Sequence, residues 1–269
     1  MAVLVTAVAA GACSSGPAGH PSSSAHRSPS DSPIVSAEPS AGVLPSPDLD
    51  FLLAQSSAAR FRSSDGVRLA GRLFGSGDTG VVLSHMIRSD QQPWWWMASL
   101  LADHGLVALA YDERGTCPGG PAGCSAGALD PGATDRDIIG AVAYLRSRGA
   151  SRVIIGGASL GGTASLWAAA KHPGLVDGVF TLSAVPFFPP FDITAKVIAA
   201  IEAPKLFAAG ARDSSAGPYV SGWKRAAAPP VEAVVLPTAA HGTDLFADPD
   251  FSARVRSLVL MFCERLASG

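Results

Sequence analysis

The chain has 269 residues, of which 48% are hydrophobic, and its 20 lysines and arginines against 22 aspartates and glutamates give a net charge of −2. This balance lacks the basic excess of a nucleic-acid-binding protein, so we expect no nucleic-acid partner. No apolar run approaches the roughly 20 residues that a membrane-spanning helix needs, which excludes an integral membrane protein of that kind.

The first 57 residues differ in composition from the rest. Residues 1–13 form a short apolar run that ends in Ala10-Gly11-Ala12-Cys13. This run resembles the signal peptide and lipobox of an exported bacterial lipoprotein, which implies lipidation of Cys13 and membrane contact through that lipid. Residues 14–57 are rich in Ser, Pro and Ala, so they predict a disordered tether. We expect an extracytoplasmic, membrane-anchored protein; secretion without a lipid and a cytoplasmic location are the alternatives.

Residues 58–269 predict a single domain of alternating strands and helices. The expected elements are a hairpin at 59–74, strands at 81–84, 106–111, 152–156, 179–185, 204–210 and 231–236, and helices at 93–104, 134–149, 160–172 and 251–266. Repeated βα units predict a mostly parallel, doubly wound sheet flanked by helices, with a site at the carboxyl ends of its strands. The segment 185–203 has room for one helix, so we expect only a minimal lid.

A Gly-Ala-Ser-Leu-Gly run at residues 157–161 lies between a predicted strand and a predicted helix. A serine at such a turn adopts a strained backbone conformation, and side chains at the two glycine positions would collide with neighbouring backbone. The N-terminus of the following helix offers N–H groups to a developing oxyanion. The pattern therefore indicates Ser159 as a nucleophile.

A nucleophilic serine needs a base, and the base needs an acid that orients it. His241 is the favoured base among the six histidines, because it lies in the loop after the predicted strand 231–236. Asp213 follows the predicted strand 204–210 in the same way and is the favoured acid, with Asp192 as a second candidate.

The order Ser159, Asp213, His241, together with the segment Tyr111-Asp112-Glu113-Arg114-Gly115, resembles the α/β-hydrolase family over residues 58–269. The resemblance implies the α/β-hydrolase fold and a reaction that uses neither a metal nor an organic cofactor. We expect Asp112 and Arg114 to form a buried structural pair.

The resemblance also implies an oxyanion hole made by the backbone N–H groups of Ile87 and Leu160. His85 follows a predicted strand and is expected to shape this loop, whereas Met86 stands where the family has glycine. The segment 85–91 is more similar to the dienelactone-hydrolase-like and small-esterase branches than to lipases.

The cysteines support export from the cytoplasm. Cys117 and Cys124 flank a turn-rich segment of Pro, Gly and Ala, which predicts a disulfide between them in an oxidising compartment. No further Cys or His lies at ligand spacing around them, so we expect no metal site. Cys263, in the predicted C-terminal helix, should be buried.

The predicted function is hydrolysis of a carboxylic ester, thioester or lactone in a small acyl substrate, through an acyl-enzyme on Ser159. The Phe187-Phe188 and Trp94-Trp95-Trp96 segments are candidates for an apolar acyl pocket. One alternative is a peptidase or acyltransferase that uses the same triad. Another is a catalytically inactive surface lipoprotein that retains the fold as a binding module.

Overall fold

The computed structural model describes residues 48–269. The signal-peptide-like segment, Cys13 and most of the expected tether lie outside the described residues. The expected boundary at residue 58 is too late, because helix α1 (Leu49–Ala54) and strand β1 (Ser56–Arg62) begin before it. Leu52 is buried, and the Ser99 hydroxyl donates a hydrogen bond to Gln55 Oε1 at 2.6 Å. These contacts tie residues 48–57 to the domain.

The strands agree closely with those expected from the sequence. They are β1, β2 (Arg68–Phe74), β3 (Thr79–Ser84), β4 (Val107–Asp112), β5 (Arg152–Ala158), β6 (Gly178–Leu182), β7 (Phe187–Phe188), β8 (Phe191–Asp192), β9 (Lys205–Gly210) and β10 (Val231–Leu236). Strand β6 ends earlier than expected, and the two-residue strands β7 and β8 form a small hairpin that the sequence pattern did not predict.

The four helices predicted at 93–104, 134–149, 160–172 and 251–266 are present, whereas α1 was not predicted. They are α1, α2 (Trp95–Asp103), α3 (Thr134–Ser147), α4 (Leu160–Lys171), α5 (Ala195–Ala199), α6 (Gly217–Ala226) and α7 (Ser252–Ala267), with short 3₁₀ turns at Gln92–Trp94, Pro131–Ala133 and Gly242–Phe246. The segment 185–203 holds the β7–β8 hairpin and the one short helix α5, as the expectation of a minimal lid requires. No helix within residues 48–269 has the length and apolar character needed to cross a membrane.

Eight strands form one sheet in the order β1-β2-β4-β3-β5-β6-β9-β10. Strand β2 pairs antiparallel with β1 and β4, and the pairs from β4 to β10 are all parallel. The chain places β4 on one side of β3 and β5 on the other, so the connections turn in opposite directions at β3. Such a switch point opens a crevice at the carboxyl ends of the strands, where ligands bind in open α/β sheets.

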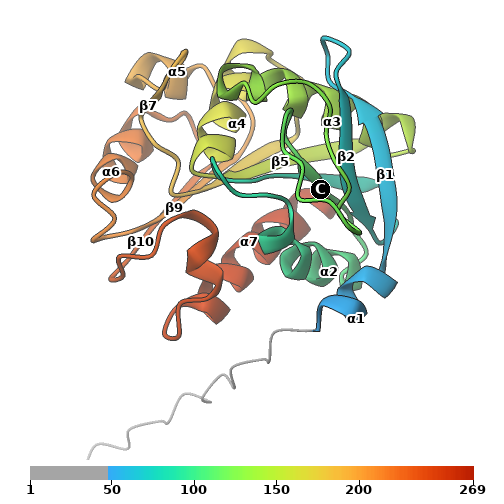
Figure 1. The fold of residues 1–269 in the computed structure, drawn as a ribbon. Coiled ribbons are helices and arrows are strands. Elements are labelled where there is room, and N and C mark those ends of the chain that lie inside the picture. The colour runs from blue at the N-terminus through green and yellow to red at the C-terminus, as the bar shows by residue number, and fades with distance from the viewer. Residues whose placement is uncertain (1–47) are drawn as a thin grey trace, which may run out of the picture. The chain divides into compact units, whose positions relative to one another are not determined.

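Two hydrophobic cores lie on opposite faces of the sheet. One contains buried side chains of α3, α4 and α6, and the other contains buried side chains of α2 and α7. Figure 1 shows α3 and α4 on one side of the sheet and α2 and α7 on the other. Because both faces are covered, the central strands are apolar on successive positions, as Val81, Val82 and Leu83 illustrate with no exposed surface.

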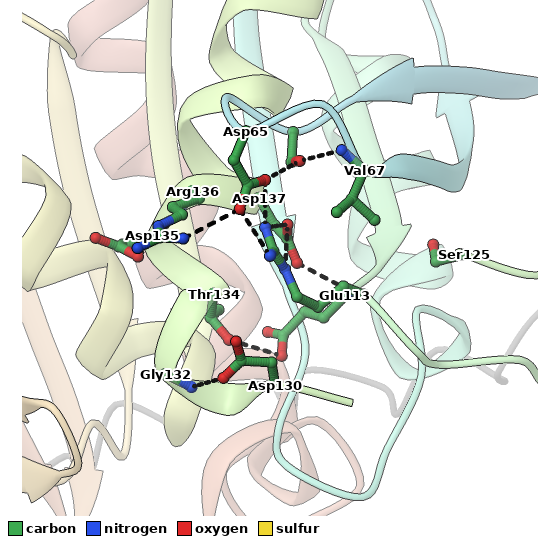
Figure 2. A network of polar contacts seen from close by, with 12 residues as sticks. Asp65, Val67, Glu113, Ser125, Asp130, Gly132, Thr134, Asp135, Arg136 and Asp137 are labelled. Atoms are coloured by element: carbon green, nitrogen blue, oxygen red, sulfur yellow. Dashed lines mark hydrogen bonds and ion pairs between the residues drawn. The ribbon is translucent and has the colours of Figure 1, made fainter. Parts of the chain in front are cut away.

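An ion-pair network holds the turn after β4 (Figure 2). The Arg114 guanidinium donates to Asp137 Oδ1 at 2.7 Å and to Asp65 Oδ1 at 2.8 Å. The expected pairing of Asp112 with Arg114 is therefore wrong. The Asp112 carboxylate instead accepts from the backbone N–H and the side-chain amide of Gln91, because the Arg114 guanidinium is taken up by Asp137 and Asp65.

The predicted disulfide between Cys117 and Cys124 is present in the loop between β4 and α3. Gly119 and Gly123 hydrogen-bond to each other inside the loop that it closes. Cys263 is a buried free thiol in α7, as expected.

Candidate active site

The turn between β5 and α4 has the geometry of a nucleophile elbow. Ser159 has φ 49° and ψ −114°, a left-handed conformation that a side-chain-bearing residue rarely adopts. A Cβ atom on Gly157 would overlap the backbone of Gly161, and one on Gly161 would stand 2.6 Å from the Ser84 oxygen. The two glycines are therefore required by close backbone packing, and they hold Ser159 at the carboxyl end of β5.

His241 and Asp213 lie together in the loops after β10 and β9. His241 Nδ1 and Asp213 Oδ2 are 2.8 Å apart, and the Asp213 side chain is buried whereas the imidazole is 31% exposed. This hydrogen bond uses Nδ1 and orients the ring, so Nε2 is on the edge of the ring opposite Asp213. Asp192, the second candidate for the acid, lies on β8 and is paired across the hairpin with Phe187.

The His241 loop packs against the elbow. A Cβ atom on Gly242 would lie 3.3 Å from Ala158 Cβ, so the residue after His241 is in contact with the residue before Ser159. Within residues 48–269, neither the Ser159 hydroxyl nor His241 Nε2 makes a hydrogen bond with another group. Bonds between catalytic groups are often incomplete before a substrate binds.

His85 shapes the loop after β3. Its Nε2 accepts the Glu113 N–H at 3.0 Å, so Nδ1 carries the proton and donates to the Met86 carbonyl at 2.7 Å. Burial lowers the pKa of His85, although the Met86 carbonyl opposes this shift, and the neutral ring fits both hydrogen bonds. Because C=O and N–H point in opposite directions across a trans peptide, the bond to Met86 turns the Ile87 N–H away from His85.

The Met86 carbonyl also accepts the Ser89 N–H at 3.1 Å. Met86 itself needs no left-handed conformation; the left-handed residue of this loop is Arg88, with φ 61°. The Met86 side chain packs onto Gly242 instead. A methionine is therefore compatible with this loop at the position where the family has glycine.

The two expected oxyanion donors lack acceptors in the described part of the chain. The N–H groups of Ile87 and Leu160 donate no backbone hydrogen bond there. The Gly161 N–H, in contrast, donates to the His85 carbonyl at 3.2 Å, which fastens the loop after β3 to the first turn of α4. The arrangement leaves two donors on adjacent backbone segments available for a ligand.

Asp213 has partners that the sequence pattern did not indicate. Its Oδ1 accepts the Ser215 hydroxyl at 2.6 Å and the Ser215 N–H at 3.1 Å. Burial raises the pKa of Asp213, but hydrogen bonds from Ser215 and His241 outweigh burial, so the pKa lies below its usual value. The only sequence signal for Ser215 is its place two residues after an aspartate, which is common in turns.

Two of the three tryptophans at residues 94–96 are core residues, which corrects the expectation of an acyl pocket for Trp94 and Trp95. Trp94 and Trp95 are buried in the core shared by α2 and α7, where Trp94 packs edge-to-face on Phe246. Trp94 Nε1 also donates to the Ser84 carbonyl at 3.0 Å. Trp96 stacks with the Arg256 guanidinium, 3.7 Å from the ring centre. Phe187, in contrast, is 60% exposed on the β7–β8 hairpin.

The sequence and the fold were compared with known proteins. Residues 80–204 match the model of a family described as alpha/beta hydrolase fold. A search of curated proteins gave no significant match.

Several solved structures share the fold. The esterase Pf2001 of Pyrococcus furiosus aligns with a TM-score of 0.67 at 17% identity, over 83% of this chain and 95% of that chain. A dienelactone hydrolase from Anabaena variabilis gives 0.62 at 22% identity, over 77% and 96%. The esterase domain of a Rhodothermus marinus protein gives 0.61 at 18% identity, over 78% and 98%. The partial family match and these structures together show that the chain has the α/β-hydrolase fold.

Proposed function

We propose that this protein is a serine hydrolase that cleaves carboxylic ester, thioester or lactone bonds through an acyl-enzyme on Ser159. The observation that carries the proposal is the combination of a strained Ser159 at the strand–helix turn with a hydrogen-bonded His241–Asp213 pair in the adjoining loop. Residues 158 and 242 are in contact, which brings the serine and the imidazole to the same end of the sheet.

In the proposed reaction, His241 Nε2 accepts the proton of Ser159 as its oxygen attacks the acyl carbonyl. Asp213 keeps the Nδ1 proton in place and stabilises the imidazolium. The N–H groups of Ile87 and Leu160 then stabilise the oxyanion. His241 returns the proton to the leaving alcohol, thiol or hydroxyl group. In the second half of the reaction, His241 accepts a proton from water as the water attacks the acyl-enzyme, and it then returns that proton to Ser159.

The β7–β8 hairpin, which contacts the helix α4 that follows Ser159, supports a substrate with an apolar portion. Phe187 is exposed on the hairpin that follows β6, and Phe188 packs beside it against the core on the α4 side. The esterases and the dienelactone hydrolase among the similar structures act on ester bonds by name, which fits the same chemistry.

The Cys117–Cys124 disulfide supports the related proposal that the protein works outside the cytoplasm. Lipidation of Cys13 would hold it at a membrane. Intact-mass measurement of the mature protein from its native membrane fraction tests both points. A lipidated Cys13 adds the mass of its acyl chains, and the oxidised Cys117–Cys124 pair lacks two hydrogen atoms.

Labelling of the full chain with a fluorophosphonate probe tests the proposed function. We expect covalent label on Ser159, located by peptide mass spectrometry, and its loss in the Ser159→Ala and His241→Ala variants. Ser165→Ala is the matched control, because Ser165 lies in α4, directly after the elbow, and its hydroxyl donates to the Gly161 carbonyl. Absence of label from folded wild-type protein would overturn the proposal and favour a binding module.

Esters, peptides and alternative acyl acceptors then separate the enzyme classes. Hydrolysis of nitrophenyl esters without cleavage of peptides supports the esterase. Faster turnover with added alcohols or amines, with the acyl group transferred to them, would identify an acyltransferase instead.

A further inference from the structure

The β1–β2 hairpin, at one edge of the sheet, carries three exposed arginines on one face (Figure 1). Arg62 lies opposite Arg68 in the register, and Arg60 stands two residues before Arg62 on the same strand. Side chains alternate along a strand and directly paired residues share a face, so all three arginines point to the same side. The buried Phe61 and Leu69 point to the other side, into the core that contains α3 and α4.

A hollow of about 520 Å³ lies beside these arginines. Its lining includes all three of them and residues 124–126, which follow the turn closed by the disulfide. The Ala126 N–H donates to the Arg68 carbonyl at 2.8 Å, which fixes this segment beside β2. The volume lies within the range of small-molecule sites, roughly 300–1,000 Å³.

The disulfide-closed loop also holds one of the guanidinium groups in place. A Cβ atom on Gly123 would stand 2.5 Å from Arg60 Nη2, so the guanidinium lies directly against the backbone of this loop. A cation fixed in this way loses less conformational freedom when it binds a ligand than a mobile one does.

The segments that form the hollow supply no carboxylate to the three arginines. Within residues 56–74 and 115–129, the only acidic residue is Asp65. Its carboxylate bonds instead to the guanidinium groups of Arg114 and Arg136. Among residues 48–269, none of the three arginines takes part in an ion pair.

Most of their N–H groups also lack an acceptor in the described part of the chain. Arg62 donates to the Gly66 carbonyl at 2.7 Å, and Arg60 donates to the Ala59 carbonyl at 3.3 Å. Arg68 donates no side-chain bond to a described residue. Because each guanidinium has five donors, the hollow offers a dense set of N–H groups to a ligand.

This arrangement lowers the stability of the hairpin. Like charges directly opposite each other on antiparallel strands are destabilising, and Arg62 and Arg68 form such a pair. Charges on an edge strand can protect it from pairing with other chains, but that protection needs neither opposed arginines nor a hollow. Local features that cost stability are expected at functional sites, and an anion would offset this cost.

We propose that the hollow is a binding site for a phosphomonoester group, held by the guanidinium groups of Arg60, Arg62 and Arg68. A phosphomonoester carries up to two negative charges and three strong acceptor oxygens, whereas a carboxylate carries one charge and two oxygens. The planar guanidinium donates pairs of parallel N–H bonds to such oxygens. The group belongs to a soluble phosphate ester or to the headgroup of a lipid with a terminal phosphate, and both present the same chemistry.

Two variants remove the charges and leave the hairpin intact. Arg68→Gln removes one of the opposed charges, so it should unfold no more readily than the wild type, and its dissociation constant for glycerol phosphate should rise roughly tenfold. The double variant Arg60→Gln/Arg68→Gln should show no measurable binding. Arg148→Gln is the matched control, because Arg148 is exposed at the C-terminal end of α3 and lies outside the hollow.

Titration calorimetry of the full chain measures binding of glycerol phosphate, with acetate as the comparison anion. Co-sedimentation with vesicles of phosphatidic acid tests the lipid source, and vesicles of phosphatidylglycerol, a phosphodiester, control for surface charge. The vesicle samples carry Cys13→Ser, which removes the proposed lipid anchor. Denaturant titrations of the same variants measure their stability.

Binding of glycerol phosphate that the double variant loses supports the inference with a soluble ester as the ligand. Binding to phosphatidic acid vesicles alone, lost in the same variant and not seen with phosphatidylglycerol, supports it with a lipid as the source. The inference is overturned if neither probe binds, if acetate binds as tightly as the phosphate, or if Arg148→Gln weakens binding equally. Lower stability of Arg68→Gln would also contradict it, because the opposed charges would then not be a cost.

Discussion

Gly157 and Gly161 pack backbone to backbone across the turn that carries Ser159, so close that a methyl group on Gly157 would overlap the Gly161 carbonyl. The last residues of β5 and the first turn of α4 are thereby pressed together. This contact forces the residue between them, Ser159, into its left-handed conformation.

Gly157→Ala should therefore disrupt the elbow. The new methyl group must push α4 away from β5, which moves both Ser159 and the Leu160 N–H, so we expect fluorophosphonate labelling to slow by at least about 10²-fold. Gly222→Ala is the control, because a Cβ there meets only the tip of the Arg225 side chain, at 3.9 Å. Normal labelling of a folded Gly157→Ala protein would contradict the elbow geometry.

His85→Ala should lower kcat and leave KM nearly unchanged. Without the bond from Nδ1, the Met86–Ile87 peptide is held by the Ser89 N–H alone, so the Ile87 donor loses its fixed direction. Loss of one oxyanion donor costs about 10²–10³ in kcat. Kinetics with a nitrophenyl ester check this, with the exposed His104→Ala as control. A change in KM alone would show that His85 serves substrate binding.

Arg114→Leu should destabilise the domain strongly. The substitution leaves the Asp137 carboxylate, which has no exposed side-chain surface, without its cation. Breaking such a buried pair lowers the free energy of unfolding by about 3–5 kcal/mol. Asp137→Asn in the same background should restore part of this loss. Arg265→Leu breaks an exposed pair with Glu232 and should cost less than about 1 kcal/mol. Urea denaturation measures all of these free energies of unfolding.

Glu113→Gln should stabilise the protein increasingly as the pH rises. Burial, with the nearby Asp137 charge, raises the pKa of Glu113 well above its usual value of 4.5. Among residues 48–269, only one of its oxygens has a hydrogen-bond partner, the Thr134 hydroxyl at 3.2 Å. The native protein thus keeps the proton to a higher pH than the unfolded chain, and wild-type stability is lost as the pH rises from about 4.5 through the native pKa.

Glutamine imitates the protonated acid and does not titrate. Denaturant titrations at several pH values measure the free energy of unfolding of both proteins. The difference between Glu113→Gln and wild type should be small below pH 4.5 and grow toward pH 8. Glu202→Gln, at an exposed position, should show no such trend. A difference that stays constant with pH would show that Glu113 is ionised in the native protein.

Phe187→Ser should reduce activity on long acyl chains more than on acetate. The exposed ring offers apolar surface on the hairpin that contacts α4, the helix after Ser159, so its loss should lower kcat/KM for an octanoyl ester about tenfold and leave the acetyl ester nearly unaffected. Met261→Ser removes a comparably exposed side chain from α7 and is the matched control. Equal losses on both esters would place the acyl group elsewhere.

The sequence by itself determined the elements and the elbow. Strands, helices and the turn at residues 157–161 follow from local patterns of apolar residues and glycine, which act over a few neighbours along the chain. The Cys117–Cys124 pairing is local in the same sense, since the two cysteines are seven positions apart across a turn-rich segment that brings its ends together.

Only the tertiary structure decided which distant side chains meet. Arg114 pairs with Asp137 rather than Asp112, and Trp94 and Trp95 enter the core rather than a pocket. Asp213 meets His241 because β9 and β10 are neighbours in the sheet, and the two residues lie in the loops that follow these strands. Strand order and the packing of helices on each face bring these groups together, and no periodicity within a single segment records that order.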